Sequence, residues 1–203
     1  MPDVVIQRLP LYARTLAFLV REEVEVVSSF DLGNLLGSTP AQIRKDLSYF
    51  GRFGKQGTGY NVAYLLSRMR EILRLENEWP MALVGVGRLG QAVARYPGFA
   101  EAGFRIAALF DTNPEKIGKR VEGIIIKPIE EMPETIRARD IEIGILAVPV
   151  DQAQRVTDLL LKGGIKAILN YAPTPLRVPA GIVVRSIDPV LILQSMTFYL
   201  HST

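Results

Sequence analysis

The sequence predicts an α/β protein in which a small helical domain precedes a doubly wound parallel sheet. Three short helical patterns open the chain, a glycine-rich turn joins an apolar strand to a helix near its middle, and strands then alternate with helices. The 203 residues are enough for two modest cores. We expect domains at residues 1–78 and 79–187, followed by a helical segment at residues 188–203.

The composition is that of a globular protein, with 48% hydrophobic and 22% charged residues. The chain contains no cysteine, which excludes disulfides, zinc–thiolate sites and thiol nucleophiles. No apolar run reaches the roughly 18 residues that a membrane span requires, and residues 1–9 do not resemble a secretory signal. We therefore expect a cytoplasmic protein with neither a membrane nor a metal partner.

The first two helical patterns are short and amphipathic. Residues 11–21 form the first, with leucines and a valine near one face, and residues 30–36 form the second. Ser28 or Ser29 can cap the second helix at its start, and Gly37 suits the left-handed position after its end. Residues 24–27 form a short apolar link between the two helices.

The third helix has the clearest start signal in the chain. Thr39 can serve as its N-cap, Pro40 suits the first helical position, and Gln42 can close a capping box. Ile43, Leu47 and Phe50 would face inward at helical spacing. Three short helices with a polar, basic third helix form the pattern of a helix-turn-helix.

The next ten residues, 51–60, contain four glycines interleaved with basic and aromatic residues, as in a β-hairpin wing. From residue 38 to residue 70 there are six basic side chains and one acid, Asp46, and such a cluster favours DNA phosphates. A protein-binding module with a solvated basic helix is the alternative. The candidate DNA-binding side chains are Gln42, Arg44, Lys45, Ser48, Tyr49, Lys55 and Gln56.

A longer helix follows the wing and leads to the domain boundary. Asn61 can cap a helix over residues 62–76. Residues 77–80 then break the helical pattern, and we place the boundary between the two domains there.

The glycine turn carries the strongest functional signal. An apolar strand at residues 81–84 runs into G-x-G-x-x-G, and a second strand ends in an acid, Asp111, 21 positions after Gly90. Gly85 permits the tight turn, Gly87 lets the backbone approach a pyrophosphate, and Gly90 lets the helix pack closely on the strand. This combination is the fingerprint of a Rossmann dinucleotide site. Its cofactor-binding candidates are Gly85, Val86, Gly87, Arg88, Leu89, Gly90 and Asp111.

Asp111 also predicts which dinucleotide is bound. Its carboxylate is placed to accept hydrogen bonds from the ribose hydroxyls and would repel a 2′-phosphate, which favours NAD⁺ and NADH over the phosphorylated cofactors. Strands are expected at residues 123–129, 141–148, 165–169 and 182–187. Ligands of such sheets bind beyond the carboxyl ends of the strands. The residues expected to border the site are therefore Val148, Pro149, Asn170, Ala172 and Pro173.

The segment Pro189–Leu200 is apolar nearly all round and is expected to be a helix. Such a helix cannot lie exposed on a monomer, so it packs either on its own domain or in a partner subunit. We favour the partner subunit, because the faces of the sheet already have covering helices in the sequence.

The chain offers a cofactor pocket without evident reaction machinery. A nicotinamide dehydrogenase needs a proton donor or base beside the hydride-transfer site. The only histidine is His201, no Tyr-x-x-x-Lys pair occurs, and no metal-binding cluster stands out. This favours a sensor over an enzyme. An NAD-dependent oxidoreductase, or a CoA-binding-type nucleotide domain, with a helical appendage is the alternative.

Several runs resemble the Rex family of redox-sensing transcriptional repressors over essentially the whole chain. They are RLPLYARTL at residues 8–16, IRKDLSYFG at 43–51, GKQGTGYNV at 54–62, VGVGRLG at 84–90, LFDTNPEKIG at 109–118 and GIKAILNYAP at 164–173. The resemblance implies a homodimer that binds palindromic operator DNA through a winged helix, senses the NADH/NAD⁺ ratio and leaves the DNA when NADH binds. It also implies that the terminal helix is swapped between subunits.

The resemblance implies residue roles as well. Arg44, Lys45, Ser48 and Tyr49 would contact the major groove or its phosphates, and Lys55 would serve the wing. Gln56 is a departure, since family members often carry a basic residue there.

A tyrosine, an arginine and an aspartate link cofactor state to the DNA-binding domain in this family. The matching positions are Tyr96, Arg14 and Asp188. By the same resemblance, Arg14 and Asp188 would pair across subunits while Tyr96 reports the state of the nicotinamide.

Overall fold

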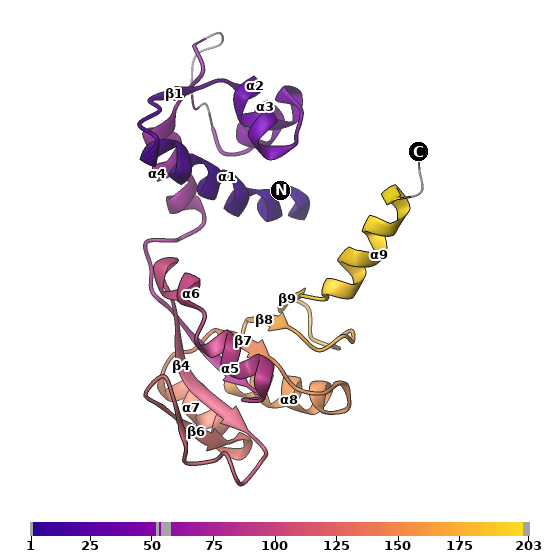
Figure 1. Ribbon diagram of the computed structural model, residues 1–203. Helices are drawn as coiled ribbons and strands as arrows, with labels where there is room; N and C mark the ends of the chain where they lie inside the picture. The colour runs from indigo at the N-terminus through magenta and orange to yellow at the C-terminus, as the bar shows by residue number, and fades with distance from the viewer. Residues whose placement is uncertain (1, 52, 54–57, 201–203) are drawn as a thin grey trace. The chain divides into compact units, whose positions relative to one another are not determined.

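The computed structural model describes residues 2–51, 53 and 58–200 (Figure 1). The chain divides into two compact units, Met1–Asn77 and Glu78–Thr203, which are described separately. The elements of the first unit are α1 (Asp3–Arg21), β1 (Val26–Val27), α2 (Ser29–Leu36), α3 (Pro40–Ser48), β2 (Tyr60–Asn61) and α4 (Val62–Ile72).

Helix α1 is longer than the sequence pattern predicted, since it begins at Asp3 rather than at residue 11. Pro10 lies inside it, where a proline removes one backbone hydrogen bond. Val5 and Leu9 are buried in the core of the unit. Their burial offsets the loss at Pro10, which is why the helix continues through a residue that normally ends one.

The predicted helix-turn-helix is confirmed in its local detail. Ser28 Oγ accepts the Asp31 N–H at 3.0 Å, and Thr39 Oγ1 accepts the Gln42 N–H at 3.2 Å. Gly37 ends α2 in the left-handed conformation, with φ at 62°. A side chain at Gly33 would lie 2.6 Å from the Ser38 carbonyl oxygen, so the turn between the two helices depends on glycine there.

The link predicted at residues 24–27 contains strand β1, which was not foreseen. β1 pairs antiparallel with β2, with Val27 opposite Tyr60 and Val26 opposite Asn61. The strand at the end of the predicted wing is therefore bonded to this distant segment, while half of the wing, residues 52 and 54–57, lies outside the described residues. Asn61 caps α4 as predicted, by accepting the Tyr64 N–H at 2.8 Å, and α4 ends at Ile72 rather than at residue 76.

The second unit holds the seven-stranded sheet and its helices. Its elements are β3 (Trp79–Val84), α5 (Arg88–Ala94), α6 (Pro97–Glu101), β4 (Phe104–Asp111), β5 (Arg120–Val121), β6 (Ile124–Pro128), η1 (Ile129–Glu131), α7 (Met132–Ala138), β7 (Ile143–Leu146), α8 (Val150–Gly163), β8 (Ala167–Asn170), β9 (Val183–Ser186) and α9 (Pro189–Leu200).

The strand order is β5-β6-β4-β3-β7-β8-β9. All neighbours pair in parallel except β5, which runs antiparallel to β6 at the edge. β5 is a correction to the all-parallel expectation: the chain leaves β5 through a tight reversal at Glu122 and Gly123, both of which have positive φ, and returns antiparallel as β6. Without β5, the order is that of a dinucleotide-binding sheet, and it reverses direction at β3, between β4 and β7.

The sheet is covered on both faces, as the doubly wound prediction requires. Ala82 and Val84 pack with α7 and α8 on one face, whereas Met81 and Leu83 pack with α5 and α6 on the other. This alternation of neighbouring residues is the period of a strand that is buried on both sides. Together the two cores hold the ends of β3, β4 and β7 in fixed register.

Helix α9 (yellow in Figure 1) matches its predicted span but has no buried residue. Leu191, Ile192, Leu193 and Met196 are all more than half exposed. Within the described part of the second unit, this apolar helix is therefore left uncovered.

Candidate functional site

A pocket of about 300 Å³ opens at the point where the strand order reverses. Gly85 and Gly87 line it after β3, Asp111 after β4, and Val148 and Pro149 after β7. Small-molecule sites of doubly wound sheets occur at this position. The pocket is therefore the candidate ligand site of the second unit.

The three glycines of the turn differ in what an added side chain would contact at each position. Gly85 has a φ of 91°, and a side chain there would lie 2.3 Å from the Ala147 carbonyl oxygen. A side chain at Gly90 would lie 1.8 Å from the Gly85 carbonyl oxygen, which leaves no room for one between α5 and β3. A side chain at Gly87 would meet nothing within 4 Å. Two glycines thus serve the fold, while Gly87 leaves open space on the pocket side for a ligand.

Asp111 is almost fully buried at the pocket wall, and its carboxylate is already bonded within the chain. Oδ2 accepts the Val86 N–H at 2.8 Å and the Lys116 ammonium at 3.0 Å, and Oδ1 accepts the Asn113 N–H at 2.8 Å. Burial raises the pKa of Asp111, but these hydrogen bonds outweigh it and hold the pKa below its ordinary value. The charged carboxylate therefore fixes the glycine turn as well as facing the pocket.

The structure brings only some of the predicted cofactor residues to the pocket. Arg88 and Leu89 are exposed in the first turn of α5, and Val86 is buried beneath the turn. Asn170 is buried and shapes its own loop, since its Nδ2 donates to the Thr174 carbonyl and its Oδ1 accepts the Ala172 N–H. Asn170, Ala172 and Pro173 are not among the residues that line the pocket.

Four polar residues of the lining were missed by the sequence reasoning. Thr112, Asn113 and Lys116 belong to the loop after Asp111, and Gln152 lies in α8. The signal was present in the run T-N-P-E-K directly after the acid, because a loop that leaves a strand end at the switch point must border the ligand.

The outward face of α3 is basic and polar, as predicted. Arg44, Lys45, Ser48 and Tyr49 are all exposed. Arg44 Nη1 donates to Ser29 Oγ at 2.9 Å, which ties this face of α3 to α2. The remaining predicted contacts, Lys55 and Gln56, lie outside the described residues.

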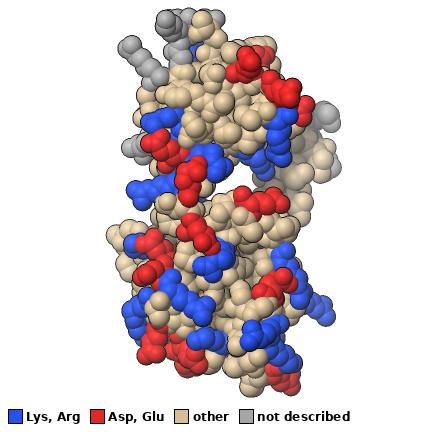
Figure 2. Space-filling view, turned by 90° about the vertical axis from the view of Figure 1, so that its left-hand side faces the viewer, with Lys and Arg blue, Asp and Glu red and all other residues tan. Residues whose placement is uncertain are grey.

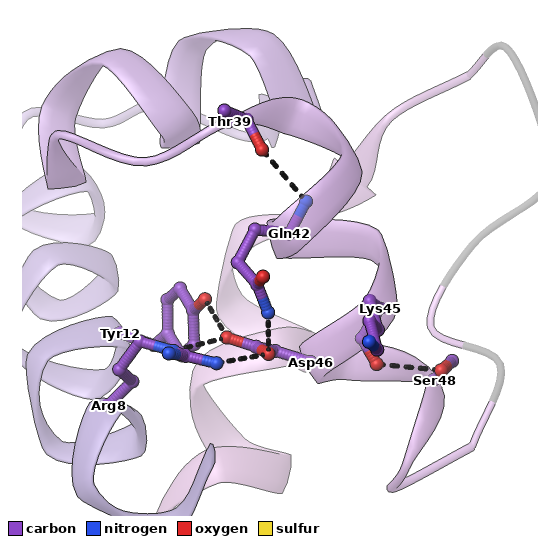
Figure 3. A network of polar contacts seen from close by, with 7 residues as sticks. All are labelled: Arg8, Tyr12, Thr39, Gln42, Lys45, Asp46 and Ser48. Atoms are coloured by element: carbon purple, nitrogen blue, oxygen red, sulfur yellow. Dashed lines mark hydrogen bonds and ion pairs between the residues drawn. The ribbon is translucent and has the colours of Figure 1, made fainter. Parts of the chain in front are cut away.

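The inward face of α3 carries the one acid of this basic segment, Asp46 (Figure 3). The Arg8 guanidinium and the Tyr12 hydroxyl of α1 both donate to its carboxylate. The side-chain amide of Gln42 donates to it as well, at 2.6 Å. Gln42 therefore turns toward Asp46 and does not complete the capping box with Thr39, which corrects the prediction. The contact with Asp46 is favoured because a hydrogen bond from the Gln42 amide to a charged carboxylate is stronger than the bond between neutral groups that the capping box would provide.

The three predicted switch residues are all accessible within their own units. Tyr96 is 59% exposed and packs edge-on against Phe99, with ring centroids 5.2 Å apart. Asp188 Oδ1 accepts the Val190 N–H at 2.9 Å and so caps the start of α9. Arg14 lies on the exposed face of α1 in the first unit.

The surface charges elsewhere are mixed. On the side of the molecule shown in Figure 2, Lys and Arg are interspersed with Asp and Glu. In the part of the chain that the structure describes, no group of three or more His, Cys, Asp or Glu side chains could hold a metal ion. No helix among the described residues is long and apolar enough to cross a membrane.

Two solved structures share this architecture over nearly the whole chain. A crystal structure of RSP in complex with β-NAD⁺ and operator DNA matches with a TM-score of 0.93 and 38% identity, over 98% of this chain and 92% of that one. RSP in complex with β-NADH matches with a TM-score of 0.89 and 35% identity, over 98% and 94%. RSP is itself described as a Rex-family repressor.

The sequence relatives decide the family. The redox-sensing transcriptional repressor Rex of Roseiflexus sp. (strain RS-1) is 59% identical over 199 residues, which are 98% of this chain and 90% of that protein. The chain belongs to the Rex family. The Rex of Brevibacillus brevis is 48% identical over 98% of this chain and 96% of its own length.

Family models agree with the division of this Rex-family chain. The model of a putative DNA-binding protein N-terminus matches residues 1–48, and the CoA binding domain model matches residues 76–174. Rex proteins are transcriptional repressors and not enzymes, which sets aside the oxidoreductase alternative. The predicted function, a redox-sensing repressor that binds DNA, is thus confirmed at the level of the family.

Proposed function

We propose that this chain represses transcription by binding palindromic operator DNA as a homodimer, and that NADH releases it. The observation that carries the proposal is the coexistence of two features in one chain. A pocket at the switch point keeps open space beside Gly87, and a helix-turn-helix presents the exposed basic side chains Arg44 and Lys45. A DNA-binding repressor acts where the chromosome is, so we place the protein in the cytoplasm.

NADH and NAD⁺ are the proposed ligands of the pocket, as they are of RSP. Gly87 would let the backbone approach the pyrophosphate, and Asp111 would accept hydrogen bonds from the adenosine ribose. The bound cofactor supplies a nicotinamide ring whose charge and shape change on reduction. We keep Gly85, Val86, Arg88, Leu89, Gly90, Val148, Pro149, Asn170, Ala172 and Pro173 as supporting residues of this site.

The homodimer is proposed on the exposed apolar surface of α9. A helix with this surface requires a partner, and a second copy of the chain provides one by symmetry. Residues 188–203 would then be the dimerisation segment, residues 1–78 would bind DNA, and residues 79–187 would bind the cofactor. A symmetric dimer holds its two recognition helices about 34 Å apart, one turn of DNA, which suits a palindromic operator.

The switch follows from that spacing. NADH and NAD⁺ control DNA binding only if they bind the two dimer conformations with different affinities. A coupling of about 1–3 kcal/mol changes operator affinity by roughly 5- to 150-fold. We propose that Tyr96, Arg14 and Asp188 carry this coupling, and that Ser48, Tyr49, Lys55 and Gln56 join Arg44 and Lys45 at the DNA.

Fluorescence anisotropy tests the proposal directly. The full chain is titrated onto a palindromic A/T-rich duplex at fixed salt, and NADH or NAD⁺ is then added. Release by micromolar NADH that NAD⁺ blunts is the expected result. DNA binding that is indifferent to both cofactors contradicts the sensing role, and a chain that binds no DNA contradicts the repressor.

Replacing Asp111 by alanine should lower the affinity for both cofactors by roughly tenfold or more and make DNA binding less sensitive to NADH. The reason is that the variant loses both the acceptor for the ribose hydroxyls and the acceptor for the Val86 N–H. Isothermal titration of each cofactor measures the loss. Glu115→Ala is the matched control, since it removes an exposed acid from the same loop. An Asp111→Ala variant with an unchanged NADH response contradicts the assigned role.

Replacing Lys45 by alanine should weaken operator binding by roughly tenfold and reduce the slope of log affinity against log salt by about one for each phosphate contact removed. NADH affinity should stay as in the wild type, because Lys45 lies in the other unit. Anisotropy at four salt concentrations measures both quantities. Lys119→Ala, an exposed lysine of the second unit, is the control, and equal behaviour of the two variants excludes Lys45 from the interface.

A further inference from the structure

The carboxylate of Asp46 joins two helices at a point that the proposed function does not use. Arg8 and Tyr12 lie one turn apart on α1, and Gln42 and Asp46 lie one turn apart on α3. Figure 3 shows the side chains of Arg8, Tyr12 and Gln42 converging on the Asp46 carboxylate. The convergence joins residues that are more than 30 positions apart in the sequence.

Each oxygen of the carboxylate accepts two hydrogen bonds. Arg8 Nη2 and Gln42 Nε2 donate to Oδ1, both at 2.6 Å, while Arg8 Nε and the Tyr12 hydroxyl donate to Oδ2 at 2.6 and 2.7 Å. The side chain of Asp46 is fully buried, whereas that of Arg8 is 31% exposed. The bidentate Arg–carboxylate pair fixes direction as well as distance.

The protonation states keep this arrangement intact. Burial raises the pKa of Asp46, but the hydrogen bonds from Arg8, Tyr12 and Gln42 outweigh it and hold the pKa below its ordinary value. Burial likewise raises the pKa of Tyr12, so its hydroxyl remains a donor. At neutral pH the carboxylate is charged and all of its donors carry their protons.

This network determines how α3 is rotated about its own axis. Apolar contacts of Ile43 and Leu47 with the core are non-directional and would tolerate a small rotation. A carboxylate that accepts four directed hydrogen bonds does not tolerate such a rotation. Since residues advance by about 100° along a helix, an inward Asp46 fixes the directions of Arg44 and Lys45.

We propose that Arg8, Tyr12 and Gln42 are positioning residues for operator recognition: through Asp46 they fix the rotation of α3, and Gln42 acts on Asp46 rather than on a base. This inference rests on the proposed binding of operator DNA. It assigns a role to the RLPLY run at residues 8–12, which the cofactor site and the basic face of α3 leave unexplained.

Two conservative variants test the proposal, Tyr12→Phe and Gln42→Met, each of which removes one donor and keeps the size of the side chain. The full-length variants are titrated onto a palindromic duplex selected from a random library by the wild type, and onto a scrambled duplex of equal length. The expected result is a roughly five- to tenfold loss of affinity for the selected duplex, with unchanged scrambled-duplex affinity and an unchanged salt slope. Gln7→Met, which changes an exposed glutamine of α1, is the matched control.

The same measurements can overturn the proposal in four ways. An equal loss on both duplexes with a reduced salt slope identifies a phosphate contact, and a changed preference at one base pair in Gln42→Met alone identifies a base contact. A lower unfolding temperature with an unchanged ratio of the two affinities identifies a purely structural role. A wild type that binds no duplex refutes the proposed function itself, whereas a binding wild type with unaltered variants refutes only this inference.

Discussion

Replacing Gly90 by alanine is expected to abolish the response to NADH while leaving operator binding in place. The added methyl group would lie 1.8 Å from the Gly85 carbonyl oxygen and 2.9 Å from its carbon. Both are backbone atoms, so no flexible side chain can move aside, and α5 must shift away from β3. Overpacking of this kind costs about 1–3 kcal/mol, and we expect cofactor affinity to fall by roughly 10- to 100-fold.

The experiment combines calorimetric titration of NADH with operator anisotropy in its presence and absence. Gly87→Ala is the informative companion, because its methyl group meets nothing within 4 Å in the chain. The Gly87→Ala variant should have an unchanged unfolding temperature but a lower affinity for NADH, because the bound cofactor would lie against Gly87. If the Gly90→Ala variant bound NADH with the affinity of the wild type, the glycine turn would not be part of the cofactor site.

Placing two glutamates on one face of α9, as Ile192→Glu with Met196→Glu, is expected to convert the proposed dimer to a monomer. Both side chains are more than half exposed in the single chain, so the substitutions cost little there, but in a subunit interface they would bury unpaired charges. A monomer engages one half-site at a time and loses the effective concentration of the second. Operator affinity should therefore fall by about 100- to 10,000-fold.

Sedimentation velocity gives the oligomeric state, and anisotropy on the same samples gives the affinity. Ile125→Glu is the control, because it charges an exposed apolar residue of β6 away from α9. A variant of α9 that still sediments as a dimer would show that this helix does not form the subunit interface.

The features predicted correctly from the sequence are those with local causes. The caps at Thr39 and Asn61 and the left-handed Gly37 depend on neighbours within four residues, and the structure has them as predicted. The glycine turn and Asp111 depend on a fixed spacing along one strand–helix–strand unit. For this reason the pocket residues Gly85, Gly87 and Asp111 were identified without coordinates.

The features that were missed depend on contacts between distant segments. Nothing near Pro10 indicates that α1 continues through it, since the compensation comes from a core that other helices build. The pairing of β1 with β2 joins residues more than 30 positions apart, as does the contact between Arg8 and Asp46. Gln42 shows the limit most clearly. Its spacing from Thr39 suggested a capping box, but its side chain binds a carboxylate whose orientation is set by α1.

The hydrogen bond from the Val86 N–H to the Asp111 carboxylate affects how fast the protein can respond to a change in cofactor. The chain itself holds the glycine turn in one shape, so a cofactor that binds there as proposed does not have to order a loop as it enters. The association rate is then set by diffusion into a preformed site. Differences in affinity between the two cofactors therefore arise mainly from their dissociation rates. A regulator built in this way follows a change in the nucleotide pool as fast as the previous occupant dissociates.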